Sequence, residues 1–354
     1  MQDKRATLVL EDGTVFEGFL FGSEKSVSGE VVFNTGMVGY PESLTDPSYS
    51  GQILVLTYPL IGNYGVPKKE IIEGLIRNFE SEKIQVKGLI VSHYSGEPSH
   101  WSCQETLDDW LKEEGIPGLQ GIPTRTLTMR LREKGTMLGK IIAQDVDVPF
   151  YDPNQENLVQ HVSANAVKEY GKGKKRIVLI DCGAKNSILS CLLERSVKVI
   201  SVPWDYDFLN MDCDGIVISN GPGNPKMCLK TIENVKKALE KDKPVFGICL
   251  GNQILALAAG MDTYKLKYGH RSQNQPCLDI QSGRCFITSQ NHGFAVKPNF
   301  KEGWEELFTN ANDGTNEGIW HKRKPFMAVQ FHPEGSPGPR DTEFLFDEFL
   351  KKMK

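Results

Sequence analysis

The spacing of hydrophobic residues changes once along the chain. Over the first 150 residues, short apolar runs with only a few helical segments predict a β-rich region. Residues 7–18 are typical of it, because apolar runs flank Asp12-Gly13 and predict a hairpin that turns there. From Arg176 onward, short apolar runs alternate with segments of helical spacing, which predicts strands joined by helices. Residues 151–176 lose apolar periodicity and gain Gly and Lys, so we expect a linker between two domains there.

The first region combines short regular elements with one long irregular segment. We expect strands at residues 29–34, 52–58 and 87–92, and helices at residues 71–79, 106–114 and 124–134. Residues 36–51, GMVGYPESLTDPSYSG, are dense in Gly, Pro, Asp and Ser, which is typical of a loop. A loop of this length and composition is often functional.

The second region predicts an α/β domain with a largely parallel sheet. The expected strands are residues 177–181, 197–203, 215–219, 244–246, 285–289 and 327–332, and the expected helices are residues 186–195, 227–241, 252–259 and 342–354. In such sheets, functional groups gather beyond the carboxyl ends of the strands. Four polar or glycine-rich segments follow expected strands directly: SNGPGNP, GICLG, QNHGF and HPE.

The segment Gly247-Ile248-Cys249-Leu250-Gly251 has the pattern of a nucleophile elbow, with sulfur in place of oxygen. Cys249 would stand at a sharp strand-to-helix turn, where flanking residues with a Cβ would collide with the strand or the helix. The N-terminus of the following helix would favour the thiolate over the thiol.

A cysteine nucleophile needs a base and a group that orients the base. His332 and Glu334 are two residues apart across Pro333, so the carboxylate can hold one ring nitrogen while the other takes the thiol proton. His292 is the rival base, although its amide-rich surroundings favour substrate contact. Backbone N–H groups of SNGPGNP and of Leu250 are candidates for an oxyanion hole.

Each of these motifs has an ordinary structural explanation. A cysteine in an apolar segment is usually a small core residue, and GPGNP alone is a tight turn. Three such features at strand ends of one predicted domain are difficult to explain by packing. We therefore interpret them together as an active site.

Composition narrows the class of protein. The chain has 354 residues, 24% charged and 39% apolar, with a net charge of −4, which argues against nucleic acid as a partner. No apolar run approaches the length of a membrane span or forms a signal-peptide core, so we expect a cytoplasmic protein. The eight cysteines include no C-x-x-C pair and no Cys/His cluster with zinc spacing. We expect free thiols and no metal site.

The motifs also carry a family resemblance. GICLGNQ, SNGPGNP, QNHGF and QFHPE resemble those of the class I, or triad, glutamine amidotransferases. LVLEDGTVFEGFLFG, the segment from GEVVFNTG to NYG, and GTMLGK resemble the small subunit, or glutaminase region, of carbamoyl phosphate synthetase. TYPLIGNYGVP, HWS and DTEFLFDEFL are most similar to the eukaryotic pyrimidine-pathway form, in which this region begins a multifunctional protein.

The resemblance implies a fold and a reaction. Residues 1–150 would form a small β-rich α+β domain, residues 151–176 a linker, and residues 177–354 a flavodoxin-like glutaminase domain with a mostly parallel sheet. Glutamine would be hydrolysed through a γ-glutamyl thioester, and the ammonia would pass to a carbamoyl phosphate synthetase partner. The chain itself would need no cofactor, because ATP, Mg and bicarbonate are used by that partner.

The same resemblance assigns roles to residues. Cys249 would be the nucleophile, His332 the base and acid, and Glu334 the residue that orients His332. Glutamine would be bound by residues of both domains, namely Ser48, Gly221, Gly223, Leu250, Gln253, Gln290, Asn291, Gly293 and Phe294.

Two positions depart from the family pattern. Asn252 stands where the family usually has His, which implies different hydrogen bonding behind the elbow, and Pro123 stands where Asp is usual. In the urea-cycle, ammonia-dependent relative of this family, another residue replaces the nucleophile. This chain keeps Cys249 and Gln253, which favours a working glutaminase.

Two alternative functions are open. One is a catalytically impaired scaffold that docks and regulates a synthetase. The other is a triad enzyme that serves another synthase, and the N-terminal region argues against it.

Overall fold

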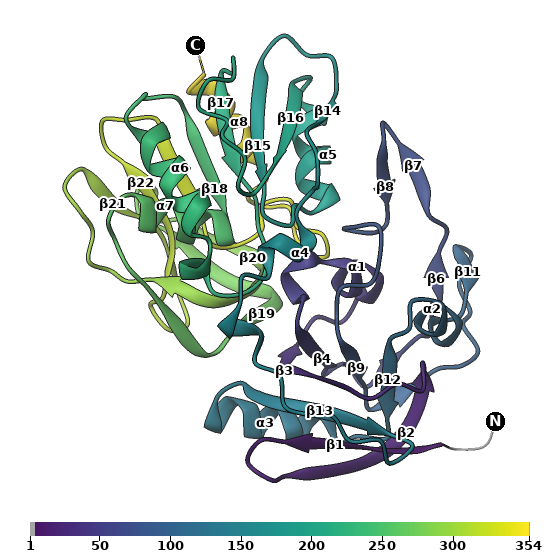
Figure 1. Cartoon of the computed structure of the whole chain (residues 1–354). Helices are drawn as coiled ribbons and strands as arrows, with labels where there is room; N and C mark the ends of the chain where they lie inside the picture. Colours follow the sequence, from purple (N-terminus) through teal and green to yellow (C-terminus); the bar gives the residue numbers. More distant parts are fainter. Residues whose placement is uncertain (1–3, 354) are drawn as a thin grey trace. The chain divides into compact units, whose positions relative to one another are not determined.

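The computed structural model describes residues 4–353 (Figure 1). The chain divides into two compact units. The first unit consists of the residues up to 71 and of Ile76–Gln155, and the second of Ile72–Leu75 and the residues from 156 onward. In the described part of the chain, no helix combines the length and the hydropathy needed to cross a membrane.

A closed barrel organises the first unit. Its strands follow the order β1-β13-β3-β4-β9-β12-β2. Their bounds are β1 (Arg5–Leu10), β2 (Val15–Gly22), β3 (Val27–Asn34), β4 (Gln52–Leu56), β9 (Gly88–Ile90), β12 (Pro117–Gln120) and β13 (Met137–Ala143). All five residues of β4 are buried, and β4 runs parallel to both of its neighbours, β3 and β9. The hairpin predicted to turn at Asp12-Gly13 is confirmed as β1 and β2.

Short elements complete the first unit. They are α1 (Tyr40–Thr45), α2 (Leu107–Glu113), α3 (Thr124–Lys134), the 3-10 turns η1 (Pro47–Tyr49) and η2 (Pro153–Gln155), and the paired strands β5 (Leu60–Ile61) with β10 (His93–Tyr94) and β6 (Val66–Pro67) with β11 (Cys103–Glu105). The predicted helices at 106–114 and 124–134 are confirmed. Thr106 caps α2, since its hydroxyl accepts the N–H of Asp109 at 3.1 Å.

The helix predicted at residues 71–79 is wrong. Those residues form a hairpin of β7 (Glu70–Ile72) and β8 (Leu75–Arg77). Glu73 and Gly74 join the strands with φ of 52° and 82°. Two consecutive positive φ values are the signature of a tight hairpin turn, which a helix cannot contain. Apolar residues at helical spacing therefore gave a misleading signal here.

The segment expected to be a loop at residues 36–51 is partly helical. It holds α1, with Pro41 in its first turn, and then η1. Asp46 starts η1 by accepting the N–H of Ser48 through its side chain at 2.9 Å. Proline and aspartate, which favoured a loop in the sequence, act here as helix starters.

A large mixed sheet organises the second unit. Its strands follow the order β14-β16-β15-β17-β18-β23-β22-β21-β19-β20. The bounds are β14 (Lys168–Tyr170), β15 (Arg176–Asp181), β16 (Lys198–Pro203), β17 (Gly215–Ile218), β18 (Val245–Ile248), β19 (Thr263–Asp279), β20 (Cys285–Val296), β21 (Trp304–Asn310), β22 (Asn316–His321) and β23 (Phe326–Val329). The run from β16 to β23 is parallel, as predicted. The antiparallel strands on either side of it were not predicted.

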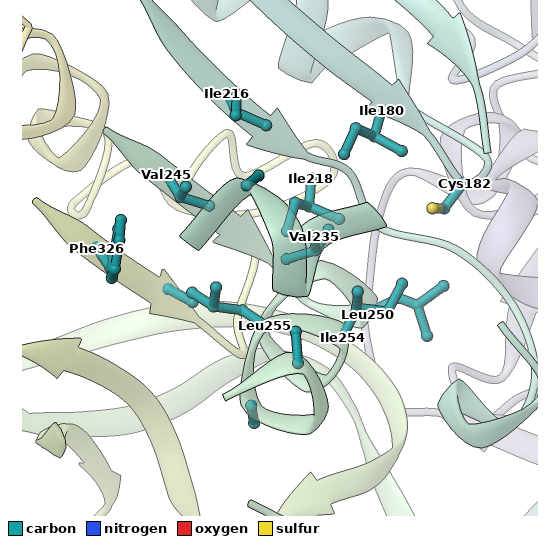
Figure 2. Packing of buried hydrophobic residues seen from close by; sticks show 14 of the residues in the cluster. Ile180, Cys182, Ile216, Ile218, Val235, Val245, Leu250, Ile254, Leu255 and Phe326 are labelled. Carbon is teal, nitrogen blue, oxygen red and sulfur yellow. The ribbon is translucent and has the colours of Figure 1, made fainter. Parts of the chain in front are cut away.

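Helices cover both faces of the parallel strands (Figure 1). The bounds are α4 (Val159–Val162), α5 (Asn186–Glu194), η3 (Pro225–Met227), α6 (Leu229–Leu239), α7 (Leu250–Ala258) and α8 (Phe344–Lys351). On one face, α6 and α7 pack against β17 and β18, and Figure 2 shows the apolar side chains of this cluster. On the other face, α5 and α8 pack against the alternate residues of β15. The α/β class is therefore confirmed.

The antiparallel part of the sheet places the QNHGF motif differently from the prediction. Residues 290–294 lie inside β20 and not in a loop after it, because β20 continues to Val296 and pairs with β19. The run is mostly polar although it is largely buried on both faces, so period-2 alternation does not reveal it as a strand. Ser289 also forms an isolated bridge with His332, whose N–H donates to the Ser289 carbonyl at 2.9 Å.

Candidate active site

Cys249 occupies the turn between β18 and α7. Its φ of 55° and ψ of −104° are strained for a residue with a side chain. A Cβ on Gly247 would lie 2.5 Å from the carbonyl oxygen of Gly251, and one on Gly251 would lie 2.1 Å from that of Ile218. The flanking glycines are therefore required by the backbone, as the sequence predicted. The helix behind the sulfur begins at Leu250, which leaves its first N–H groups free of intrahelical partners.

His332 and Glu334 form a buried pair. The Nδ1–H of His332 donates to Oε1 of Glu334 at 2.6 Å, and the two residues are 2% and 0% exposed. This bond fixes the tautomer, so Nε2 is the nitrogen left to exchange a proton. Among the described residues, no side chain or backbone group makes a hydrogen bond to Nε2 within normal limits.

Lys185 joins this pair, although sequence reasoning missed it. Its Nζ donates to the same Glu334 oxygen at 2.8 Å, and the residue is only 2% exposed. The backbone N–H of Lys185 donates to the side chain of Asn220 at 3.1 Å, in the SNGPGNP segment. The sequence did contain a signal for this residue, because Lys185 comes shortly after the expected strand 177–181. The other candidate site residues also follow expected strands.

The electrostatics of this group favour an ion pair. Burial alone would lower the pKa of His332, but the Glu334 carboxylate outweighs it and the pKa of His332 rises to about 10. Burial would raise the pKa of Glu334, but the Lys185 ammonium and the His332 ring lower it to about 2. Cys249 also contributes to the rise at His332. The arrangement therefore stabilises an imidazolium beside the sulfur.

The thiol is held from the other side by β20. Cys249 is 2% exposed, and its S–H donates to the carbonyl oxygen of Asn291 at 3.6 Å. Gln253 donates from Nε2 to the carbonyl of Phe294 at 2.9 Å and to Oε1 of Gln330 at 3.1 Å. These bonds fasten α7 to β20 and to the segment that leads into His332.

Asn252 takes part in the same network. It is fully buried, and its Nδ2 donates to Oε1 of Gln330 at 3.1 Å, so Gln330 accepts from two neighbouring residues of α7. The side chain at this position therefore supports the segment that carries His332. The sequence predicted that Asn252 changes the hydrogen bonding behind the elbow, but it did not identify Gln330 as the partner of Asn252.

Comparison with known proteins agrees with this geometry. The glutamine amidotransferase class-I family matches residues 178–352, and the carbamoyl-phosphate synthase small chain domain matches residues 8–141. Each of the two regions predicted from the sequence thus matches one family. The expected resemblance is thus confirmed.

Three relatives illustrate how far the similarity extends. Multifunctional protein CAD of Squalus acanthias is 56% identical over 98% of this chain and 16% of its own length. Multifunctional protein URA2 of Saccharomyces cerevisiae is 50% identical over 99% of this chain and 18% of its own length. The mitochondrial carbamoyl-phosphate synthase [ammonia] of Homo sapiens is 51% identical over 99% of this chain and 24% of its own length. The chain thus spans about a sixth to a quarter of these relatives.

Within this amidotransferase domain, several of the expected glutamine-binding residues lie near Cys249. Leu250 and Gln253 follow it on α7. The carbonyl of Asn291 accepts a hydrogen bond from Cys249, and the carbonyl of Phe294 accepts one from Gln253. Gly221 lies against Leu250, because a Cβ on Gly221 would come within 2.7 Å of the Leu250 side chain.

The other expected residues have different surroundings. Gly223, with φ of 82°, lies beside Leu158, and Gly293 lies near the Arg271 guanidinium. The Gln290 amide donates to Cys277 and Thr288. Ser48 is buried in η1 of the first unit.

His292, the rival base, is engaged elsewhere. Its ring bonds the Phe294 carbonyl and the Gln290 side chain at 2.9 and 3.0 Å. Burial lowers the pKa of His292 well below its ordinary value. These contacts leave His332 as the better candidate for the base, as the sequence favoured.

Replacing Glu334 with glutamine should lower the pKa of His332. In the native chain the pKa of His332 lies near 10, above its ordinary value of 6.5, so its charged form stabilises the fold below pH 6.5 and this contribution is lost as the pH rises through about 10. Without the carboxylate, burial and Lys185 both disfavour the imidazolium, so the ring should be neutral at pH 7. A pH titration by NMR with labelled histidine measures this, with the exposed histidines as internal reference. A His332 signal that still titrates near pH 10 in Glu334→Gln would contradict the assigned cause.

Proposed function

We propose that the chain hydrolyses L-glutamine to glutamate and ammonia through a γ-glutamyl thioester on Cys249. The observation that carries this proposal is the buried chain of Lys185, Glu334 and His332 ending beside a thiol on a strained elbow. A core cysteine needs neither a strained backbone nor a buried ion pair beside it. The family of residues 178–352 supports the same reaction.

The residues have distinct roles in this reaction. In the reacting form the thiol proton has passed to Nε2 of His332, and the thiolate, paired with this imidazolium, attacks the side-chain amide carbon of glutamine. The N–H of Leu250, with a backbone N–H from Gly221 or Gly223, stabilises the oxyanion. His332 then gives its proton to the departing ammonia. Water, deprotonated by His332, attacks the thioester and releases glutamate, and the proton returns to the sulfur.

Glu334 keeps His332 in the tautomer that this cycle requires, and Lys185 keeps Glu334 ionised. Glutamine contacts are proposed for the residues inferred from the family, which are Ser48, Gly221, Gly223, Leu250, Gln253, Gln290, Asn291, Gly293 and Phe294. Among them, Asn291, Gln253 and Phe294 have the strongest support, since they are bonded to Cys249 or to one another.

The proposed destination of the ammonia is a carbamoyl phosphate synthetase, supported by the small chain family of residues 8–141. In this proposal, residues 1–150 form the small chain domain, residues 151–176 the linker and residues 177–354 the glutaminase domain. The partner uses ATP, Mg and bicarbonate to make carbamoyl phosphate for pyrimidine synthesis. We place this reaction in the cytoplasm.

A second candidate is a docking scaffold with impaired chemistry. Asn252 favours it, because this buried position departs from the family pattern. So does the human relative, which is 51% identical and whose name specifies ammonia.

A glutamine-analogue diazo-ketone separates the two candidates. We expect one adduct per chain, at Cys249, that excess glutamine prevents. The exposed Cys285 provides the control, because iodoacetamide should modify it with or without glutamine. An unlabelled Cys249, both alone and with an added synthetase, would favour the scaffold.

A further inference from the structure

Two histidines and a glutamate meet inside the antiparallel part of the second unit. His270 lies on β19, His292 lies opposite it on β20, and Glu317 lies on β22. All three are buried, and one potential ligand atom of each lies within 4.8 Å of the others. The residues are far apart in the sequence, so no spacing rule indicates the cluster. The reaction proposed above uses none of the three.

Hydrogen bonds fix the tautomer of His292. Its Nδ1 lies 2.9 Å from the Phe294 carbonyl, which can only accept, so Nδ1 carries the proton. Its Nε2 therefore has a lone pair in the neutral ring, and burial keeps the ring neutral by lowering its pKa. This lone pair faces the Gln290 side-chain oxygen at 3.0 Å and Glu317 Oε1 at 3.9 Å. Three acceptors thus face one another.

His270 is oriented in a similar way. Its Nε2 lies 2.9 Å from Oδ2 of Asp313 and donates to that carboxylate. Its Nδ1 then faces Oε1 of Glu317 at 3.2 Å. A carboxylate that holds the outer nitrogen of a histidine is the usual support for a metal-binding imidazole.

Glu317 leaves the cluster with unused acceptor capacity. It is 0% exposed, and its Oε1 accepts from Asn310 at 3.1 Å. Its Oε2 has no hydrogen-bond partner among the described residues. Oε1 also lies beside ring nitrogens of both histidines, and a buried carboxylate facing two imidazole lone pairs is unfavourable unless a cation lies among them.

We propose that His270 Nδ1, His292 Nε2 and Glu317 bind a divalent transition-metal ion, with Zn²⁺ preferred, and that Gln290 Oε1 or a water molecule completes the set. Zn²⁺ in a tetrahedral site with Zn–N near 2.0–2.1 Å places neighbouring ligand atoms about 3.3 Å apart. The separations of 3.2 and 3.9 Å from Glu317 need only a small adjustment. Two imidazoles favour zinc over magnesium or calcium.

Protonation of His270 is a simpler alternative to a metal ion in this cluster. Burial disfavours this proton, but Glu317 and Asp313 raise the pKa of His270 above its ordinary value. The proton would satisfy Nδ1 of His270 and leave Nε2 of His292 facing the Gln290 oxygen and Oε2 of Glu317 unbonded. A metal ion would satisfy Nδ1 of His270, Nε2 of His292 and the Glu317 carboxylate together.

The site would also stabilise the strand that holds the thiol. His292 directly follows Asn291, whose carbonyl accepts the S–H of Cys249. The metal would join β19, β20 and β22 at this point. The inference rests on the second unit alone and stands whether or not the chain hydrolyses glutamine.

Zinc binding to the full chain tests the proposal directly. After metal is removed with a chelator, competition against a chromogenic chelator should show saturable binding of one Zn²⁺ per chain. His270→Asn and Glu317→Gln each remove one ligand and should weaken binding by at least about 100-fold. His161→Asn, at an exposed histidine of the same unit, is the matched control and should leave binding unchanged.

The His270 and Glu317 variants change buried residues and could misfold, so Asp313→Asn provides a second test at a partly exposed residue. The Asp313 side chain is 44% exposed, so its replacement should leave the fold intact, as far-UV circular dichroism can verify. It removes only the support of His270 and should weaken binding by about 10- to 100-fold. Unchanged affinity in this variant would overturn the proposal.

Cobalt substitution identifies the ligands. Co²⁺ should give the absorption of a tetrahedral site without thiolate charge transfer, because the proposed ligands are nitrogen and oxygen. Strong thiolate charge transfer would place the ion on a cysteine and overturn the assignment. So would the absence of saturable binding to the wild-type chain.

Discussion

Cys249→Ala should abolish glutamine hydrolysis and leave the chain folded. The variant removes the sulfur that would form the proposed thioester, so turnover should fall by at least about 10³-fold. The structural cost is small, because the sulfur makes one weak bond, to the Asn291 carbonyl at 3.6 Å, and the elbow is held by Gly247 and Gly251. Glutamate release, measured with and without an added carbamoyl phosphate synthetase, reports turnover.

Cys191→Ala is the matched control for this experiment. Cys191 is another buried cysteine of the second unit, on α5, and burial raises its pKa to about 12, so it is unreactive. Its replacement should leave turnover within a few-fold of the wild type. Substantial hydrolysis by a folded Cys249→Ala chain would refute the thioester route.

Lys185→Met should strongly destabilise the second unit. Glu334 is fully buried and its Oε1 accepts from both Lys185 and His332, so loss of the ammonium leaves its carboxylate with His332 as the remaining cationic partner. Breaking a buried pair in this way typically costs about 3–5 kcal/mol in the free energy of unfolding. Hydrogen-exchange protection of the amides in β18 and α7 reports this quantity for the second unit alone.

A double variant tests the physical reason. Adding Glu334→Gln to Lys185→Met removes the buried carboxylate that has lost its lysine partner, so the double variant should be more stable than Lys185→Met. Lys226→Met is the matched control, because Lys226 pairs with Asp262 at the surface, and it should keep the protection of the wild type. If the double variant lost as much protection as the sum of the single changes, the ion pair would not be the cause.

The sequence allowed the chemistry of the elbow to be predicted because that chemistry is local. Gly247 and Gly251 flank Cys249 within five residues, and the steric reason for them can be argued without a structure. His332 and Glu334 could likewise be paired, since they are two residues apart. The parallel strands were predicted for a similar reason, because each is a short apolar run that is visible in its own residues.

The remaining features depend on contacts between distant residues. Lys185 and Glu334 are 149 positions apart, and no local pattern pairs them. The polar run 290–294 belongs to a strand only because β19 lies against it. The failure at residues 71–79 has the opposite origin, since the apolar spacing was helical but Glu73 and Gly74 impose a turn.

The bridge between Ser289 and His332 has a consequence for how the chain folds. In pairing order β20 is the last strand of the sheet, yet it returns to bond the backbone of the residue that faces the thiol. Cys249 and its neighbour Asn291 are separated by 42 residues, and Lys185 and Glu334 by 149, so large loops must close before these groups meet. We therefore expect a refolding chain to regain its helices well before its thiol becomes reactive toward substrate. In a newly synthesised chain, the Cys249 thiol would therefore not react with substrate until β20 has paired.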